Sequence, residues 1–205
     1  MEYWDVCDRN GKKLGYTKHS DEKFLDGEYH LGASVWIADS RGRLLIQKRA
    51  ASKRTGASLW SITGGKVRAG ERSIEACVRE VKEELGFVLD QQDIRFLYRS
   101  TGSNMLFDDY IIVRDLPIEK AHLEPSEVSE IRWADLDEIQ ALCHNREFMY
   151  NNISDLTSVR NYLDTYFAEK LSSEAAGQPV IKQHPVGSSA VSHLFPGESG
   201  TSQSS

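Results

Sequence analysis

The segment from Ser73 to Leu85 constrains the fold of this chain most strongly, because its pattern specifies one amphipathic helix. Ser73 is a suitable N-cap residue, and Gly86 stands where a left-handed residue is favoured at a helix C-terminus. Apolar residues recur at helical spacing and define a stripe that faces the core, namely Ile74, Cys77, Val78, Val81 and Leu85. Cys77 therefore reads as a buried core residue and not as a nucleophile.

Three carboxylates share another face of the same helix. Glu80, Glu83 and Glu84 stand at i, i+3 and i+4, beside the apolar stripe. Like charges at this spacing destabilise a helix by roughly a few tenths of a kcal/mol per pair. Mg²⁺ would relieve the repulsion, because it prefers carboxylate oxygens and keeps water molecules for substrate phosphates. For three glutamates taken alone, an ordinary solvated acidic face is the simpler alternative.

A longer pattern surrounds these glutamates and overrides that alternative. Residues 65–87 match GX5EX7REUXEEXGU, where U is a bulky aliphatic or aromatic residue, through Gly65, Glu71, Arg79, Glu80, Val81, Glu83, Glu84, Gly86 and Phe87. The sequence thereby resembles the Nudix hydrolase superfamily over most of residues 1–170. The resemblance implies an α/β fold in which a mixed β-sheet is sandwiched between helices. It also implies hydrolysis of a diphosphate linkage that depends on Mg²⁺, with Mn²⁺ as a substitute.

The resemblance also implies roles for residues of the motif. The implied metal ligands are Gly65, through its carbonyl in a loop before the helix, and Glu80, Glu83 and Glu84. Glu80 or Glu83 would be the catalytic base for a water molecule that a metal activates. Arg79 would pair with Glu71 and lock that loop onto the helix, although a weak surface ion pair is the alternative.

Further candidates lie outside the motif or at its edge. Lys48, Arg49 and Lys66 are candidates for binding the substrate phosphates, because the acidic helix cannot do so without help. Glu127 and Glu130 precede a predicted strand and are candidates for an additional acid or base, with a solvated loop as the alternative.

The rest of the chain divides into three predicted regions. Residues 1–28 form an N-terminal hairpin extension, with strands at 3–7 and 14–17 around Asn10-Gly11, a pair that supplies the positive φ angles of tight turns. Residues 29–171 form the Nudix domain, with a basic loop at 48–60, strands expected at 30–38, 44–47, 94–98, 105–113 and 131–133, and helices at 135–142 and 154–171. Residues 172–205 are rich in Ser, Gly, Pro and Glu, which predicts a disordered tail.

The N-terminal half resembles the isopentenyl diphosphate isomerase-like branch of the superfamily, in residues 3–5, 27–31 and 45–49. An isomerase would need a catalytic cysteine and a metal-binding histidine just before the helix, and those positions hold Gly64 and Lys66. His30 does stand where isomerases carry a metal-ligating histidine, but a lone histidine at the start of a strand is usually structural. The isomerase and a non-catalytic Nudix binding module are therefore the alternatives, and hydrolysis is favoured because all three motif glutamates are retained.

The amino-acid composition limits the kinds of binding partner that we expect for this protein. The chain has 31 acidic and 25 basic residues, a net charge of −6, which argues against a general binder of nucleic-acid polymers. Three distant cysteines without a CxxC pair argue against a disulfide framework or a zinc site, and no segment has the composition of a signal peptide or a membrane span. We expect a cytoplasmic enzyme without a membrane partner, acting on a small diphosphate, specifically a nucleoside diphosphate linked to another group. A homodimer is left open.

Overall fold

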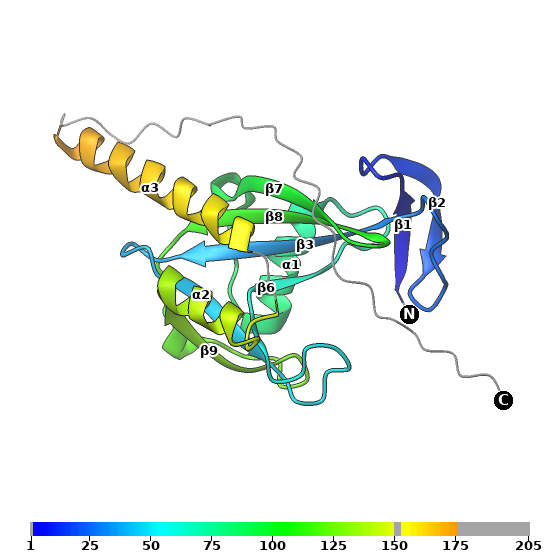
Figure 1. Ribbon diagram of the computed structural model, residues 1–205, viewed down its shortest axis with the longest axis horizontal. Helices are drawn as coiled ribbons and strands as arrows, with labels where there is room; N and C mark the ends of the chain where they lie inside the picture. The colour runs from blue at the N-terminus through cyan, green and yellow to red at the C-terminus, as the bar shows by residue number, and fades with distance from the viewer. Residues whose placement is uncertain (1, 150–152, 176–205) are drawn as a thin grey trace.

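A central sheet and three helices form the main domain of the protein, and the computed structural model describes residues 2–149 and 153–175 (Figure 1). The seven strands of this sheet are β3 (His30–Ala38), β4 (Leu44–Arg49), β5 (Trp60–Ser61), β6 (Thr63–Lys66), β7 (Arg95–Thr101), β8 (Met105–Val113) and β9 (Val128–Ala134). The helices are α1 (Ser73–Leu85), α2 (Leu136–His144) and α3 (Ile153–Ala175), with short 3-10 turns at Gln91–Asp93 and Ile118–Lys120.

Strand β3 organises the sheet. It runs parallel to β8 along its whole length, from His30 opposite Met105 to Ala38 opposite Val113. Its other edge pairs with β6 near the start and with β4 only at Ala38 and Leu44. Strand β4 then diverges and pairs with β9 and β5 in the antiparallel direction. The sheet is therefore mixed, because the pairing of β3 with β8 is parallel.

The two faces of the sheet carry separate cores. Because side chains alternate along a strand, Val35 and Ile37 of β3 contact a core that includes α1, whereas Trp36 contacts a core that includes α2 and α3. All three side chains are buried. The sheet is thus covered by α1 on one face and by α2 and α3 on the other, which confirms the predicted α/β sandwich.

A separate two-stranded sheet precedes this domain, as predicted. It consists of β1 (Tyr3–Cys7) and β2 (Lys13–His19), and Figure 1 shows it apart from the central sheet, at the end of the molecule opposite α3. Backbone hydrogen bonds between Cys7 and Tyr29 and from Ala69 N to Tyr3 O join it to the domain. In its turn Gly11 has a φ of +81°, but Asn10 does not share the positive φ that the Asn-Gly pair predicted.

Two boundaries differ from the predictions. The N-cap of α1 is Arg72, whereas Ser73 is the first helical residue and its hydroxyl pairs with that of Tyr110 at 2.7 Å. Helix α3 continues to Ala175, so residues 172–175 are helical, and the remainder of the predicted disordered tail lies outside the described residues. Within the described chain, none of the helices combines the length and the apolar character needed to span a bilayer.

Strands β5 and β6 are a further correction, because residues 48–60 were expected to be a loose basic loop and Gly65 to lie in a loop. Gly65 instead pairs with Ala33 in the sheet. The short strand Thr63–Lys66 has two glycines, which are depleted in strands, and its partner β3 lies about 30 residues earlier in the chain.

Candidate active site

Two adjacent glycines allow β6 to pass between β3 and α1. A Cβ atom on Gly64 would lie 2.6 Å from the carbonyl oxygen of Ala33 in β3. A Cβ atom on Gly65 would lie 2.1 Å from Oε1 of Glu80 in α1. The absence of side chains at both positions therefore brings the carboxylate of Glu80 directly against the backbone of the strand.

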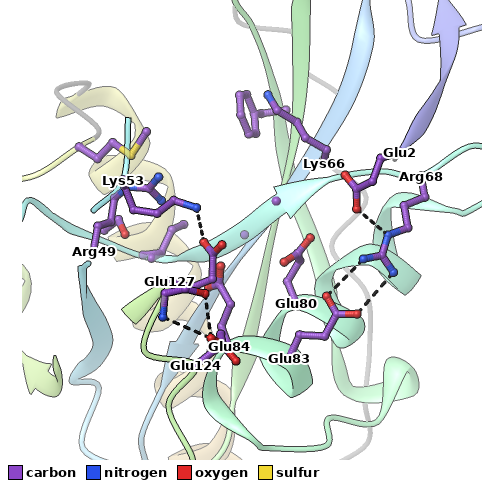
Figure 2. A pocket seen from close by; sticks show the side chains of 17 residues that line it. Glu2, Arg49, Lys53, Lys66, Arg68, Glu80, Glu83, Glu84, Glu124 and Glu127 are labelled. Carbon is purple, nitrogen blue, oxygen red and sulfur yellow. Dashed lines mark hydrogen bonds and ion pairs between the residues drawn. The ribbon is translucent and has the colours of Figure 1, made fainter. Parts of the chain in front are cut away.

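A cavity of about 630 Å³ opens beside this contact, and Figure 2 shows its charged lining. Arg49 and Lys53 lie on one side of it, Lys66 and Arg68 lie on the other, and Glu80 and Glu84 lie between them (Figure 2). The remaining lining residues are Glu2, Ser61, Ile62, Gly64, Gly65, Glu83, Phe107, Glu124, Ser126, Glu127 and Met149.

Glu84 is the most enclosed of the three helix carboxylates, with 5% of its surface exposed. Its Oε2 accepts a hydrogen bond of 2.7 Å from Nε2 of Gln47, whose own Oε1 accepts one of 2.8 Å from the hydroxyl of Thr63. Burial raises the pKa of Glu84 to about 7, the hydrogen bond from Gln47 opposes that rise, and the charges of Glu80 and Glu127 add to it.

Arg79 holds the other motif carboxylates. It donates to both oxygens of Glu71 at 2.9 and 3.0 Å and to the carbonyl of Lys66 at 2.9 Å, so it ties the segment before α1 to the helix. It also donates to Glu80 at 2.7 Å and to Glu83 at 3.1 Å. Burial raises the pKa of Glu80, and the hydrogen bond from Arg79 limits that rise.

The pKa of Glu71 shifts in the opposite direction from that of Glu80. Burial on its own would raise the pKa of this carboxyl, but hydrogen bonds from Arg79 and from the Arg68 backbone lower it below its usual range. Glu71 is thus an anion held by Arg79, while at Glu80 and Glu84 burial outweighs the hydrogen bonds and raises the pKa. That difference separates a structural carboxylate from two that could take up a cation.

The three predicted phosphate-binding residues are not all brought together. Arg49 and Lys66 line the cavity, but Lys48 does not, and its Nζ lies 5.6 Å from the ring centre of Trp60. Lys48 and Arg49 are neighbours on β4, so their side chains point to opposite faces of the sheet. Of these two neighbours, only Arg49 therefore lines the cavity.

The two predicted acid–base candidates also separate. Glu127 lines the cavity and forms an ion pair with Lys53. Glu130 is exposed, lies opposite Lys48 in the β4–β9 pairing, and is not part of the lining. Only Glu127 therefore stays a candidate.

Lys66 occupies an unusual environment for a cation. Its Nζ lies 5.5 Å from the ring centre of Phe107 and 5.8 Å from that of Trp4 in the N-terminal hairpin. Burial lowers the pKa of Lys66 to about 8. No carboxylate of the described chain forms an ion pair with it, so its charge is available to an anionic ligand.

Several lining residues were not predicted from the sequence. Glu124 reaches the cavity because its backbone N–H donates to the carbonyl of Glu84 at 3.0 Å, which fixes its loop to the end of α1. Arg68 forms ion pairs with Glu2 at 3.0 Å and with Glu83 at 3.4 Å. The basic run that includes Lys53 was a usable signal, whereas no local pattern marks Glu2 or Glu124.

The acidic residues supply the right atoms for a divalent cation, but they do not yet surround one point. Among the described residues, no group of three His, Cys, Asp or Glu side chains is arranged to hold a metal ion. Glu80 and Glu83 instead bond to arginines, and Glu84 bonds to Gln47. The all-oxygen donor set, and the absence of a side chain at Gly65 beside Glu80, fit Mg²⁺ or Mn²⁺ once those two glutamates rotate away from Arg79.

Two further residues bear on the isomerase alternative. Cys77 is fully buried, and burial raises the pKa of its thiol well above the usual value, which fits a core residue. His30 is buried and stacked on the ring of Trp4 with centroids 4.6 Å apart. Burial, followed by the charge of Lys66, lowers the pKa of His30 to about 3.

Comparisons with known proteins agree with this architecture. The NUDIX domain family model matches residues 28–155. An uncharacterized Nudix hydrolase of Listeria monocytogenes is 34% identical over 172 residues, which cover 82% of this chain and 100% of the relative. An isopentenyl-diphosphate Delta-isomerase of Halorhodospira halophila is 31% identical over 147 residues, which cover 69% of this chain and 84% of the isomerase.

Among solved structures, the crystal structure of DR0079 from Deinococcus radiodurans is similar with a TM-score of 0.63 and 21% identity, covering 78% of this chain and 98% of that one. That likeness supports the fold, and the family model and the sequence relatives identify the family. The chain therefore belongs to the Nudix family, as a hydrolase on the branch that also contains isopentenyl-diphosphate isomerases.

Proposed function

We propose that the protein is a pyrophosphohydrolase that depends on Mg²⁺ or Mn²⁺ and cleaves a diphosphate linkage in a small molecule, specifically a nucleoside diphosphate linked to another group. One observation carries this proposal. Glu80, Glu83 and Glu84 line the same cavity as Arg49 and Lys66, so candidate metal ligands and candidate phosphate-binding cations face one another. Diphosphates bound with a divalent cation need both kinds of group.

Each residue has a proposed task. Glu80, Glu83, Glu84 and the carbonyl of Gly65 would hold the cation, which supplies a Lewis acid that acidifies water and neutralises charge on a phosphate. Arg49 and Lys66 bind the phosphates, and Arg79 and Glu71 hold the segment before α1 in place. Glu80 or Glu83 accepts the proton from the attacking water molecule.

Two other lining groups support binding of a polar substrate. The hydroxyl of Ser61 is buried and has no hydrogen-bond partner among the described residues, which is unfavourable unless a ligand or water supplies one. Glu127, held by Lys53, is a second acceptor for a proton at the opposite side of the cavity. We place the enzyme in the cytoplasm, with this small molecule as its partner in preference to a nucleic-acid polymer or a membrane.

The same geometry disfavours isomerisation. Gly64 has no side chain that could transfer a proton, and the ammonium of Lys66 cannot act as a metal ligand in its charged form. A non-catalytic module is disfavoured because all three glutamates of α1 are retained and line the cavity.

The test is release of phosphate or pyrophosphate from a panel of nucleoside diphosphate derivatives and other small diphosphates, with Mg²⁺ and with Mn²⁺. We expect Glu83→Gln to abolish release while the melting temperature is unchanged, because this side chain is half exposed. Glu130→Gln is the matched control, since this exposed glutamate lies outside the cavity, and it should retain full activity. If no compound on the panel is hydrolysed with either metal, the proposal fails. Exchange of solvent protons into isopentenyl diphosphate should be absent, and its presence would favour the isomerase.

A further inference from the structure

A buried chain of hydrogen bonds ends on one oxygen of Glu84. Thr63 in β6 donates to Gln47 in β4, and Gln47 donates to Glu84 in α1, at 2.8 and 2.7 Å. Thr63 and Gln47 are each 3% exposed, and Glu84 is 5% exposed. The chain thus links three elements of the domain, and all three side chains are almost fully shielded from water.

The chemistry of the groups fixes the direction of this chain. The oxygen of an amide can only accept a hydrogen bond, so the hydroxyl of Thr63 must donate to Oε1 of Gln47. The NH₂ group of Gln47 is then left facing Glu84. A reversed amide would set its oxygen against the carboxylate and leave buried groups without partners, which costs about 1–3 kcal/mol. The carboxylate of Glu84, which only accepts, therefore selects the orientation in which Gln47 donates, and Thr63 completes it by donating to the Gln47 oxygen.

The result is a carboxylate with one oxygen held and one oxygen free. Oε2 of Glu84 is taken by Gln47, while Oε1 makes no hydrogen bond within the described part of the chain. Glu80 and Glu83 differ, because both accept hydrogen bonds from Arg79. Of the three motif glutamates, Glu84 is already free of arginine and already oriented at the cavity wall.

We propose that Gln47 and Thr63 are positioning residues that fix Glu84 for a divalent cation. The inference deepens the proposed function and depends on it. Hydrogen-bond partners of this kind orient a ligand before the metal arrives, so binding does not have to order a mobile side chain. Glu84 would act as the preset ligand, and Glu80 and Glu83 would join it after they leave Arg79.

The test measures Mn²⁺ binding to the full chain without substrate, from the free-ion signal in electron paramagnetic resonance. Thr63→Val keeps the shape of the side chain and removes the hydroxyl, and we expect roughly tenfold weaker Mn²⁺ affinity. Thr63→Ser restores a hydroxyl at the same place and should return the affinity to near that of the wild type. A purely packing role for Thr63 predicts the reverse order, because serine leaves a cavity and valine does not.

Gln47→Met provides a second variant, because it keeps the length of the side chain and removes the donor to Glu84. It should weaken Mn²⁺ binding at least as much as Thr63→Val. If Thr63→Val is unfolded at the assay temperature, Gln47→Met alone tests the positioning role. If the wild type binds Mn²⁺ and both variants bind it equally well, the positioning role is wrong while the proposed function stands. If the wild type binds no Mn²⁺, the proposed metal-dependent function is overturned and this inference falls with it.

Discussion

Gly65 lies where β6 packs against Glu80 of α1, and Gly65→Ala tests whether the position of Glu80 controls the reaction. The added Cβ atom would lie 2.1 Å from Oε1, 2.4 Å from Cδ and 2.9 Å from Oε2 of Glu80. Since non-bonded heavy atoms are best separated by about 3.5 Å, the carboxylate must withdraw by more than about 1 Å. A displacement of this size at a reacting group costs on the order of a hundredfold in rate.

The same substitution should cost little stability. The clashing atoms are the end of a flexible side chain, so Glu80 can turn away and lose only its hydrogen bond to Arg79, about 1 kcal/mol. We therefore expect kcat for phosphate release to fall about a hundredfold, while urea denaturation shows a free energy of unfolding lower by about 1 kcal/mol.

Gly64→Ala is the matched control, because its clash is with the backbone. Its Cβ atom would lie 2.6 Å from the carbonyl oxygen of Ala33 and 2.8 Å from Cα of Ser34, and neither can move without disturbing the pairing of β3 with β6. We expect this variant to lose about 2–3 kcal/mol of stability, which is more than the loss expected for Gly65→Ala. Wild-type kcat in Gly65→Ala, or equal stability losses in the two variants, would refute the reasoning.

Three further predictions follow from the same contacts. Arg79→Lys cannot reproduce the paired hydrogen bonds to Glu71, so we expect a loss of about 2 kcal/mol in urea denaturation, and unchanged stability would contradict this role. Lys66→Met keeps the volume beside the aromatic rings and removes the charge. We therefore expect KM for the diphosphate substrate to rise roughly tenfold, with a smaller change in kcat. An unchanged KM would exclude phosphate binding by Lys66. The pKa of His30 is lowered to about 3 in the folded protein, whereas in the unfolded chain this histidine takes up its proton near pH 6.5. Because only the unfolded chain binds the proton in this range, the free energy of unfolding decreases progressively as the pH falls from about 6.5 toward 3. The part of this loss between pH 7 and 5 is about 2 kcal/mol, and His30→Phe should remove it, which urea denaturation of both proteins at the two pH values would detect or disprove.

Local patterns predicted the helix that carries the motif, but they did not predict how the site is assembled around it. Helix α1 was predictable because its apolar stripe, its acidic face and Gly86 are all contained in one short segment. Strand β6 was not, because its glycines argue against a strand and its partner β3 is remote in sequence.

The residues of the candidate site also differ in whether the sequence predicted their positions. The contact between Arg79 and Glu71 was expected from the motif, and both residues meet as expected. Lys48 lies outside the cavity that its neighbour Arg49 lines, because adjacent side chains on a strand point to opposite faces, and the basic run alone does not indicate this strand. Glu124 depends on the fold of a distant loop against the end of α1, for which the sequence has no local signal.

Helix α1 faces the core with one stripe and the cavity with the next, and this arrangement has a consequence for protein engineering. Substitutions at Cys77 or Val81 that change side-chain volume would shift the helix and carry the carboxylates with it, so stabilising mutations on this face are expected to be traded against turnover. The core on the α2–α3 face, around Ile139 and Val159, lies on the other side of the sheet and is the better place to seek added thermal stability. During evolution the same asymmetry would allow more sequence change in the core on the α2–α3 face than in the core on the α1 face.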